Sequence, residues 1–315
     1  ASWMLVGLGV LVRLVRFLVD YPIWHDEAFL AASLWDRGPA ELAKPLEYGQ
    51  VAPWMFLLVE RLFVTTLGYN EMTLRLFPTL CSMASVVVFR HMAARVLRGW
   101  ALVLATAILA VAFYPIRHGN EIKPYATDLL AAIVLLTIAV EYLRRPDRSR
   151  WWWIGAAAMP ALLGMSYPAV FVAGGVAAAL APGILLKGSN RVRAGFVAYG
   201  LAMVATFAVI YLAATVSQQK AMGDHYRFGY WRESFPPMDA PLWIPLWLVD
   251  AHAGNLMAYP VGERRGGSSA TLICAAVGLV ALWRSGRRTT AAVFLAPFGL
   301  GLVAGVSGAI IVGAL

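Results

Sequence analysis

Residues 3–19 of this chain read WMLVGLGVLVRLVRFLV, an apolar run of the length that crosses a lipid bilayer. A hydrocarbon core about 30 Å thick takes about 20 mostly apolar residues per helix. Similar runs recur along the 315 residues, 60% of which are hydrophobic, and the mean hydropathy is +0.68. We therefore predict an all-α polytopic membrane protein with about nine transmembrane helices. The candidate spans cover residues 3–19, 76–94, 101–116, 125–143, 151–165, 169–186, 195–215, 269–283 and 290–310.

Two long connections interrupt this series, residues 20–75 and residues 216–268, whereas the other connections are short. The first contains apolar residues at helical spacing over 26–37 and again over 53–67, so we expect two helices that lie in the membrane interface. Gly38-Pro39 and Gly68 mark the ends of these helices, and Pro53 marks a start. The whole chain is interpreted as a single transmembrane domain with two outer loops.

The ends of the chain carry a further expectation. It begins without Met and finishes in Gly313-Ala314-Leu315, within or just after an apolar run. We expect that residues are missing at the ends and that further helices follow Leu315.

The formal net charge of +9 comes from basic residues in four short loops that alternate with the other connections and contain a single acid, Asp147. The positive-inside rule places these loops in the cytoplasm and both long connections outside. The charge is therefore a topology signal for the inner or plasma membrane, and we expect no nucleic acid partner. The basic residues are Arg90, Arg95 and Arg98; Arg144, Arg145, Arg148 and Arg150; Lys187, Arg191 and Arg193; and Arg284, Arg287 and Arg288.

An acidic pair, Asp26-Glu27, follows the first span directly. Carboxylates are costly next to hydrocarbon and cheap in water, so one of them can accept a proton from a hydroxyl in a water-filled, outward-facing cavity. The alternative is that Asp26 only caps a short helix on the membrane surface. Adjacent helical residues point in different directions, so Glu27 is expected to do a different job, such as anchoring a helix.

A second charged cluster, RHGNEIKPY at residues 117–125, links the third and fourth spans on the outer side. One interpretation is a solvated turn in which Pro124 opens the next helix. Positive charge has no topological purpose on this side, so Arg117, His118 and Lys123 are candidates for binding a phosphate at the membrane surface. Asp128 is either functional or paired with Lys123 or Arg117.

Other polar residues near the outer surface leave alternatives open. Arg13 and Arg16 either snorkel or are held by a carboxylate or a lipid phosphate. Arg75 either snorkels or pairs with Glu71. Arg264 opposes the positive-inside trend and is a second phosphate candidate.

The second outer loop is aromatic, and its rings either anchor it among head groups or form a lid over a sugar or lipid chain. Tyr230 and Trp231 are the expected stacking residues. Cys81 and Cys274 lie in apolar spans, and the sequence has no zinc spacing. The aromatic residues are Tyr226, Phe228, Tyr230, Trp231, Phe235, Trp243 and Trp247.

The order of these motifs resembles the GT-C glycosyltransferases, in the branch of the protein O-mannosyltransferases and lipid A aminoarabinose transferases. The resemblance covers nearly the whole chain and is best through residue 145. Members of this kind often run longer, with more helices or a C-terminal outer domain. The motifs are Asp26-Glu27; Tyr48 to Pro53; Leu74 to Pro78; Glu121, Lys123, Tyr125 and Asp128; and Tyr230-Trp231 with Phe235 to Pro237.

This resemblance implies an inverting glycosyltransferase at the outer membrane face, with Asp26 as the general base. The donor is a sugar on a polyprenyl phosphate, the acceptor hydroxyl belongs to a glycan, lipid or protein, and no metal or other cofactor is expected. The residues expected to contact substrate are Tyr48, Gln50, Arg117, His118, Glu121, Lys123, Tyr125, Tyr230, Trp231 and Arg264.

Two other functions share some of these features. A transporter or flippase of a polyprenyl-linked lipid needs polar groups through the full membrane depth, whereas the charges here gather at the outer rim. A non-catalytic subunit of the same fold has no need of Asp26, Glu121 and Lys123.

Overall fold

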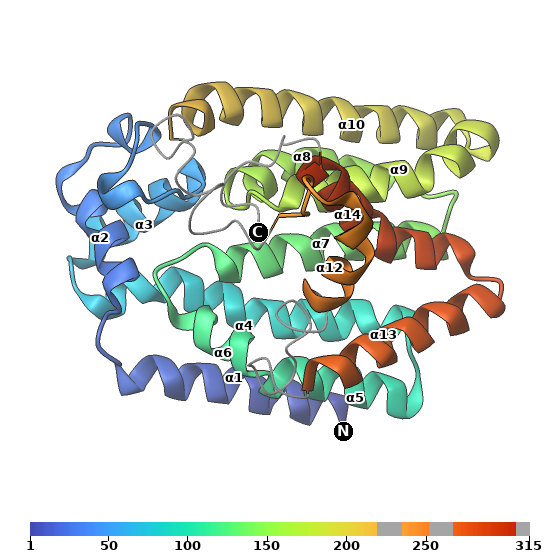
Figure 1. Cartoon of the computed structure of the whole chain (residues 1–315), viewed down its shortest axis with the longest axis horizontal. Coiled ribbons are helices and arrows are strands. Elements are labelled where there is room, and N and C mark those ends of the chain that lie inside the picture. Colours follow the sequence, from blue (N-terminus) through green and yellow to red (C-terminus); the bar gives the residue numbers. More distant parts are fainter. Residues whose placement is uncertain (219–234, 252–266, 307–315) are drawn as a thin grey trace.

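The computed structural model describes residues 1–218, 235–251 and 267–306, and its regular elements within these ranges are all helical. The long helices run side by side, and α2 and α3 lie together at one end of them (Figure 1). The helices are α1 (Ser2–Val19), α2 (His25–Asp36), α3 (Trp54–Leu67), α4 (Glu71–Val96), α5 (Gly99–Val111), α6 (Phe113–Arg117), α7 (Tyr125–Arg144), α8 (Arg150–Gly164), α9 (Ala169–Lys187), α10 (Asn190–Ile210), α12 (Ile244–Ala251), α13 (Gly267–Arg284) and α14 (Arg288–Val306).

The prediction of nine spans is wrong for the described residues. Six helices are long and apolar enough to cross a membrane, α1, α4, α7, α9, α10 with its extension to Gln218, and α14, and a bent pair raises the number to seven. The predicted span at 151–165 fails because α8 has 15 residues, about 22 Å at 1.5 Å per residue. The segment near 269–283 fails because its described apolar part, Thr271–Arg284, is also short of a span.

The helices pack in pairs that are distant in the sequence. Helix α4 lies against α7, α1 against α4 and α5, α8 against α10, and α9 against α14. Two glycines let α8 and α10 approach closely: a Cβ on Gly155 would lie 2.8 Å from the Tyr199 ring, and one on Gly195 would lie 3.1 Å from Trp152. These small residues therefore determine where the two backbones meet.

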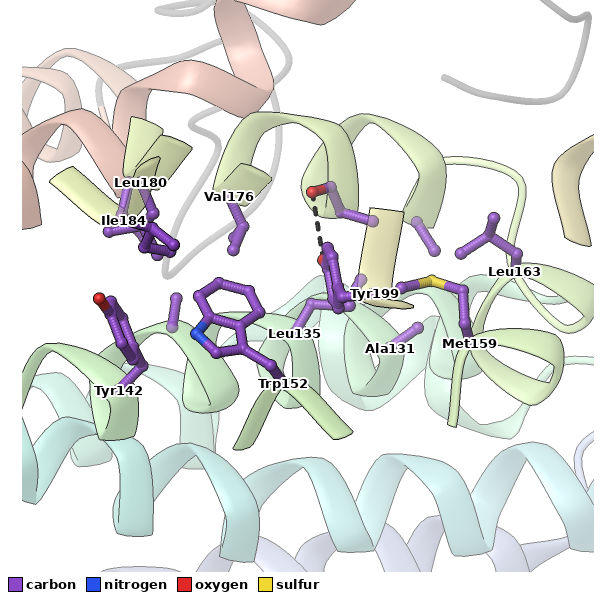
Figure 2. Close-up of a cluster of buried hydrophobic side chains, with 14 of the residues drawn as sticks. Ala131, Leu135, Tyr142, Trp152, Met159, Leu163, Val176, Leu180, Ile184 and Tyr199 are labelled. Carbon is purple, nitrogen blue, oxygen red and sulfur yellow. Dashed lines mark hydrogen bonds between the residues drawn. The ribbon is translucent and has the colours of Figure 1, made fainter. Parts of the chain in front are cut away.

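The larger hydrophobic core lies between α7, α8, α9 and α10 (Figure 2). Trp152 and Tyr199 are fully buried there, with ring centroids 5.2 Å apart in an edge-to-face arrangement. The Tyr199 hydroxyl donates to the Ala173 carbonyl at 3.1 Å, the dashed line in Figure 2. A buried phenol thus keeps a hydrogen-bond partner while its ring joins α10 to α9.

A separate core fills the end of the bundle where α2 and α3 lie. Leu34 of α2, Phe56 of α3, Leu74 of α4 and Ile122, just before α7, are buried together. The predicted helices at 26–37 and 53–67 are confirmed. Helix α3 follows Pro53 and ends at Gly68, whose φ of 93° suits glycine alone.

The predicted span at 101–116 is broken. The chain bends by 50° at Ala112, between α5 and α6. This bend removes the helical partners of the last α5 carbonyls, and Arg13 replaces them, donating to Leu109 at 3.0 Å and to Ala110 at 3.1 Å. Arg13 also donates to Ser82 at 2.9 Å, and Ser82 in turn donates to Pro115 at 3.2 Å. Arg13 is fully buried, so it neither snorkels nor reaches Glu121; it fixes the break that leads into residues 117–125.

We expect Arg13→Met to lower the free energy of unfolding by about 3 kcal/mol, because two buried carbonyls lose their donors. Unfolding in detergent measures the effect. The control is Arg16→Met, since Arg16 is partly exposed and lies over the Tyr21 ring at 4.9 Å. Equal stability of the two variants would contradict the structural role of Arg13.

Candidate functional site

Glu27 is the centre of a buried ion pair that joins three segments. Its side chain is 5% exposed and lies 3.2 Å from Arg75 Nη2, whose side chain is 6% exposed. Glu27 also accepts hydrogen bonds from the backbone N–H of Ile122 and of Trp24, each at 3.0 Å. Glu27 therefore anchors α2 to α4 and to the loop before α7, and these contacts leave it poorly placed for proton transfer.

Asp26 is in the opposite situation. Its side chain is 52% exposed and lies 3.3 Å from His25 Nε2. It does not cap α2, because the N-cap is Trp24 and the carboxylate that accepts from the Trp24 backbone is Glu27. The carboxylate is therefore accessible to solvent, and its place on the floor of an outward-facing cavity stays a prediction.

Lys123, in the loop before α7, interacts electrostatically with this carboxylate. Its Nζ donates to Gln50 Oε1 at 2.5 Å, which joins the turn at residues 48–53 to the loop before α7. Burial lowers the pKa of Lys123, and the nearby carboxylates of Asp26, Glu121 and Glu27 oppose that change. Asp26 and Lys123 therefore interact electrostatically, and their membership of one site stays a prediction.

The remaining charges of residues 117–125 pair with each other. Glu121 accepts from His118 Nδ1 at 2.6 Å and from Arg117 Nε at 3.2 Å. Burial alone would raise the pKa of Glu121, but its hydrogen bond to His118 and the positive charges of His118 and Arg117 outweigh burial and lower it. The His118 ring stacks on Tyr114 at 5.4 Å and lies 4.9 Å from the exposed Tyr125 ring.

Tyr48 forms an exposed aromatic surface near these groups. Its ring stacks on Phe29 of α2 with centroids 4.5 Å apart. Its backbone has a φ of 53° and a ψ of 30°, a left-handed conformation that bulky residues rarely adopt. Such strain is frequent at functional positions.

Asp128 forms neither of the two ion pairs that we considered. Its carboxylate interacts with Ser166, in the turn before α9, and its Oδ1 is buried with no hydrogen bond among the described residues. The neighbouring Tyr167 donates to the Ala52 carbonyl at 3.0 Å, and burial raises its pKa. These contacts attach the turn at residues 48–53 to α9.

The sequence reasoning missed the role of Arg75 and the backbone N–H of Ile122. A cation at the outer end of a span, where the positive-inside rule requires none, was the available signal for Arg75. Tyr230, Trp231 and Arg264 lie outside the described residues. Within the described ranges, no group of three or more His, Cys, Asp or Glu side chains is placed to bind a metal ion.

Comparisons of this chain with protein-family models, with characterised proteins and with solved structures find no match.

Proposed function

We propose that this protein transfers a sugar from a polyprenyl-phosphate donor to an acceptor hydroxyl at the outer face of the membrane. One observation carries the proposal: Asp26 is exposed and free of the anchoring bonds that occupy Glu27, and it interacts electrostatically with Lys123, whose amine donates to Gln50. A proton acceptor and a cation in one place are what direct displacement at a sugar phosphate needs.

In the proposed step, Asp26 takes the proton of the acceptor hydroxyl while the acceptor oxygen forms a bond to the anomeric carbon. The bond between that carbon and the phosphate oxygen breaks, and its electron pair leaves with the polyprenyl phosphate. Lys123, with Arg117 or His118, stabilises the charge that grows on this phosphate. Attack opposite the leaving group inverts the anomeric centre.

The exposed rings near Asp26 have a role in this proposal. Tyr48 stacked on Phe29, together with Tyr125, offers apolar faces for a sugar ring or an isoprenoid chain.

The test uses the purified full chain in liposomes with radiolabelled polyprenyl-phosphate sugars and candidate acceptors from membrane extracts. Label that moves to an acceptor, with release of polyprenyl phosphate, supports the proposal. Label that crosses the bilayer on an unchanged donor indicates a flippase and overturns it. Donor that neither reacts nor moves, with every sugar tested, indicates a non-catalytic subunit and also overturns it.

We expect Lys123→Ala to raise the KM for the donor about tenfold or more, with a smaller effect on the KM for the acceptor, because the lost cation faces the phosphate. Initial-rate kinetics with each substrate varied in turn measure the difference. Lys44→Ala is the control, since Lys44 is an exposed lysine of the connection 20–75, which the charge pattern assigns to the same side of the membrane. An equal effect on both substrates would contradict the assignment of Lys123 to the donor phosphate.

A further inference from the structure

A basic pocket lies at the end of the bundle opposite Asp26. It has a volume of about 270 Å³ and is formed where α4, α7 and the α13–α14 turn meet. Arg75, near the first site, and Arg95, in this pocket, are twenty positions apart on α4, so roughly 30 Å separates the two places. The lining residues are Arg95, Val96, Val140, Leu143, Arg144, Gly286, Arg287, Thr289 and Thr290.

Glu141 fixes two of the three arginines. This carboxylate is buried, with a side chain 6% exposed, and lies 2.6 Å from Arg95 Nε and 3.5 Å from Arg144 Nη1. One carboxylate pairs with two guanidiniums here, and Arg287 adds a third, so the pocket keeps an excess of positive charge.

The α13–α14 turn places Arg287 by its backbone geometry. Gly286 has a φ of 77°, its N–H donates to Trp283 at 3.2 Å, and the Arg287 N–H donates to Leu282 at 2.9 Å. This is the glycine-terminated helix end in which two carbonyls of the last turn regain donors. Arg287 Nη1 also donates to the Val96 carbonyl, the last of α4, at 3.1 Å. The turn is therefore fixed to α4, and α14 begins at the pocket, where the positive end of its dipole favours an anion.

The size and lining of the pocket indicate its ligand. A volume of about 270 Å³ is at the lower limit for small-molecule sites, which suits a phosphate with a small substituent better than a nucleotide. Arginine forks match phosphate oxygens, and the two threonines add hydroxyl donors. Val96, Val140 and Leu143 give the pocket an apolar side at the level where membrane spans end.

We propose that this pocket binds a phosphate group, and that an anionic phospholipid headgroup supplies it. Basic pockets between the ends of membrane helices are recognition sites for such headgroups. Arg95, Arg144 and Arg287 belong to three basic loops of the topology pattern, and the structure assembles them around one cavity. This site is independent of the transferase activity proposed above.

The experiment measures phosphatidylglycerol binding to the delipidated full chain by native mass spectrometry, with phosphatidylcholine as the zwitterionic reference. We expect Arg144→Gln and Arg287→Gln each to weaken phosphatidylglycerol binding about fivefold, and the double variant about 25-fold, since each arginine contributes a similar amount. Arg148→Gln is the matched control, because Arg148 is an exposed arginine of the α7–α8 loop that does not line the pocket.

A second arm separates the two sources of phosphate. Inorganic phosphate is added in lipid-free detergent at constant ionic strength, and the melting temperature is recorded for the wild type and the double variant. Stabilisation of the wild type alone supports the phosphate site. If phosphatidylglycerol binding is at the same time unchanged in the double variant, the source is a soluble phosphate compound and the assignment to a lipid headgroup is overturned. A loss of phosphatidylglycerol binding in Arg148→Gln that equals the loss in Arg144→Gln or Arg287→Gln indicates diffuse surface charge and overturns the proposal. Unchanged binding in the double variant, with no phosphate effect, overturns it as well.

Discussion

Replacement of Asp26 by Asn is expected to reduce sugar transfer at least 100-fold, to the background of the assay, while expression and stability remain those of the wild type. The amide has the size of the carboxylate but cannot accept the acceptor proton, and general bases contribute roughly 10²–10⁴-fold to rates. The side chain is 52% exposed, and its only ion-pair contact among the described residues is with His25, so folding does not depend on it. Transfer from a labelled polyprenyl-phosphate donor measures the effect.

Asp36→Asn is the matched control for this prediction. Asp36 is an exposed aspartate at the other end of the same helix, α2, so the two variants have the same net charge and chemistry. Only the Asp26 variant is expected to lose activity. Wild-type turnover by Asp26→Asn would remove Asp26 as the base, and equal losses in both variants would assign the effect to the charge of the outer loop.

The helices of the first outer loop could be predicted because their boundaries are local. Pro53 sets a backbone angle before α3, and Gly68 takes a positive φ after it, so neither depends on distant residues. The number of spans depends on the lengths of the helices, and hydropathy does not locate helix ends well. The apolar run at 101–116 contains Pro115, which cannot donate a helical hydrogen bond to Val111, but hydropathy alone hid the break. The bend at Ala112 is stabilised by Arg13 from another helix, which no local pattern predicts.

The candidate site could be predicted in part, because some of its residues lie in local motifs and others are paired over long distances in the sequence. Asp26, Gln50 and Lys123 were selected from three separate segments, and the structure joins these segments through the Lys123–Gln50 and Ile122–Glu27 hydrogen bonds. The partner of Arg75 was missed, because the nearby Glu71 was considered and the actual partner, Glu27, is 48 residues away. Hydropathy and spacing carry no information about that long-range pairing.

The charge pattern predicted which loops lie together. The ends of α4 and α7 and the α13–α14 turn meet at one pocket, and the α9–α10 turn lies at the same end of the bundle (Figure 1). The positive-inside rule concerns orientation alone, however, and it does not distinguish scattered arginines from arginines that share a cavity. Glu141, buried on the last turn of α7, is the residue that turns a basic surface into a defined pocket.

A loss of stability as large as that of Arg13→Met is expected from breaking the buried pair of Glu27 and Arg75. Glu27→Gln keeps the size of the side chain but leaves the guanidinium of Arg75 with only Asp20, at 3.8 Å and 43% exposed, as a charged partner. Removing one partner of a buried ion pair typically costs 3–5 kcal/mol, and we expect a loss of about 3 kcal/mol for either Glu27→Gln or Arg75→Gln. Chemical unfolding in detergent micelles measures the loss, and intrinsic tryptophan fluorescence reports it.

The double variant, Glu27→Gln with Arg75→Gln, identifies the pair as the cause. Once both charges are gone, no buried charge is left without a partner, so the double variant should lose at least about 1 kcal/mol less than the sum of the single variants. Glu71→Gln, one turn before Arg75 on α4, serves as the control. Its change in the free energy of unfolding should add to that of Arg75→Gln, without coupling between the two. Coupling of Arg75 to Glu71 in place of Glu27 would mean that α2 is not attached to α4 in this way. The electrostatic interaction of Asp26 with Lys123 depends on that attachment, because Glu27 also binds the backbone of Ile122, the residue before Lys123.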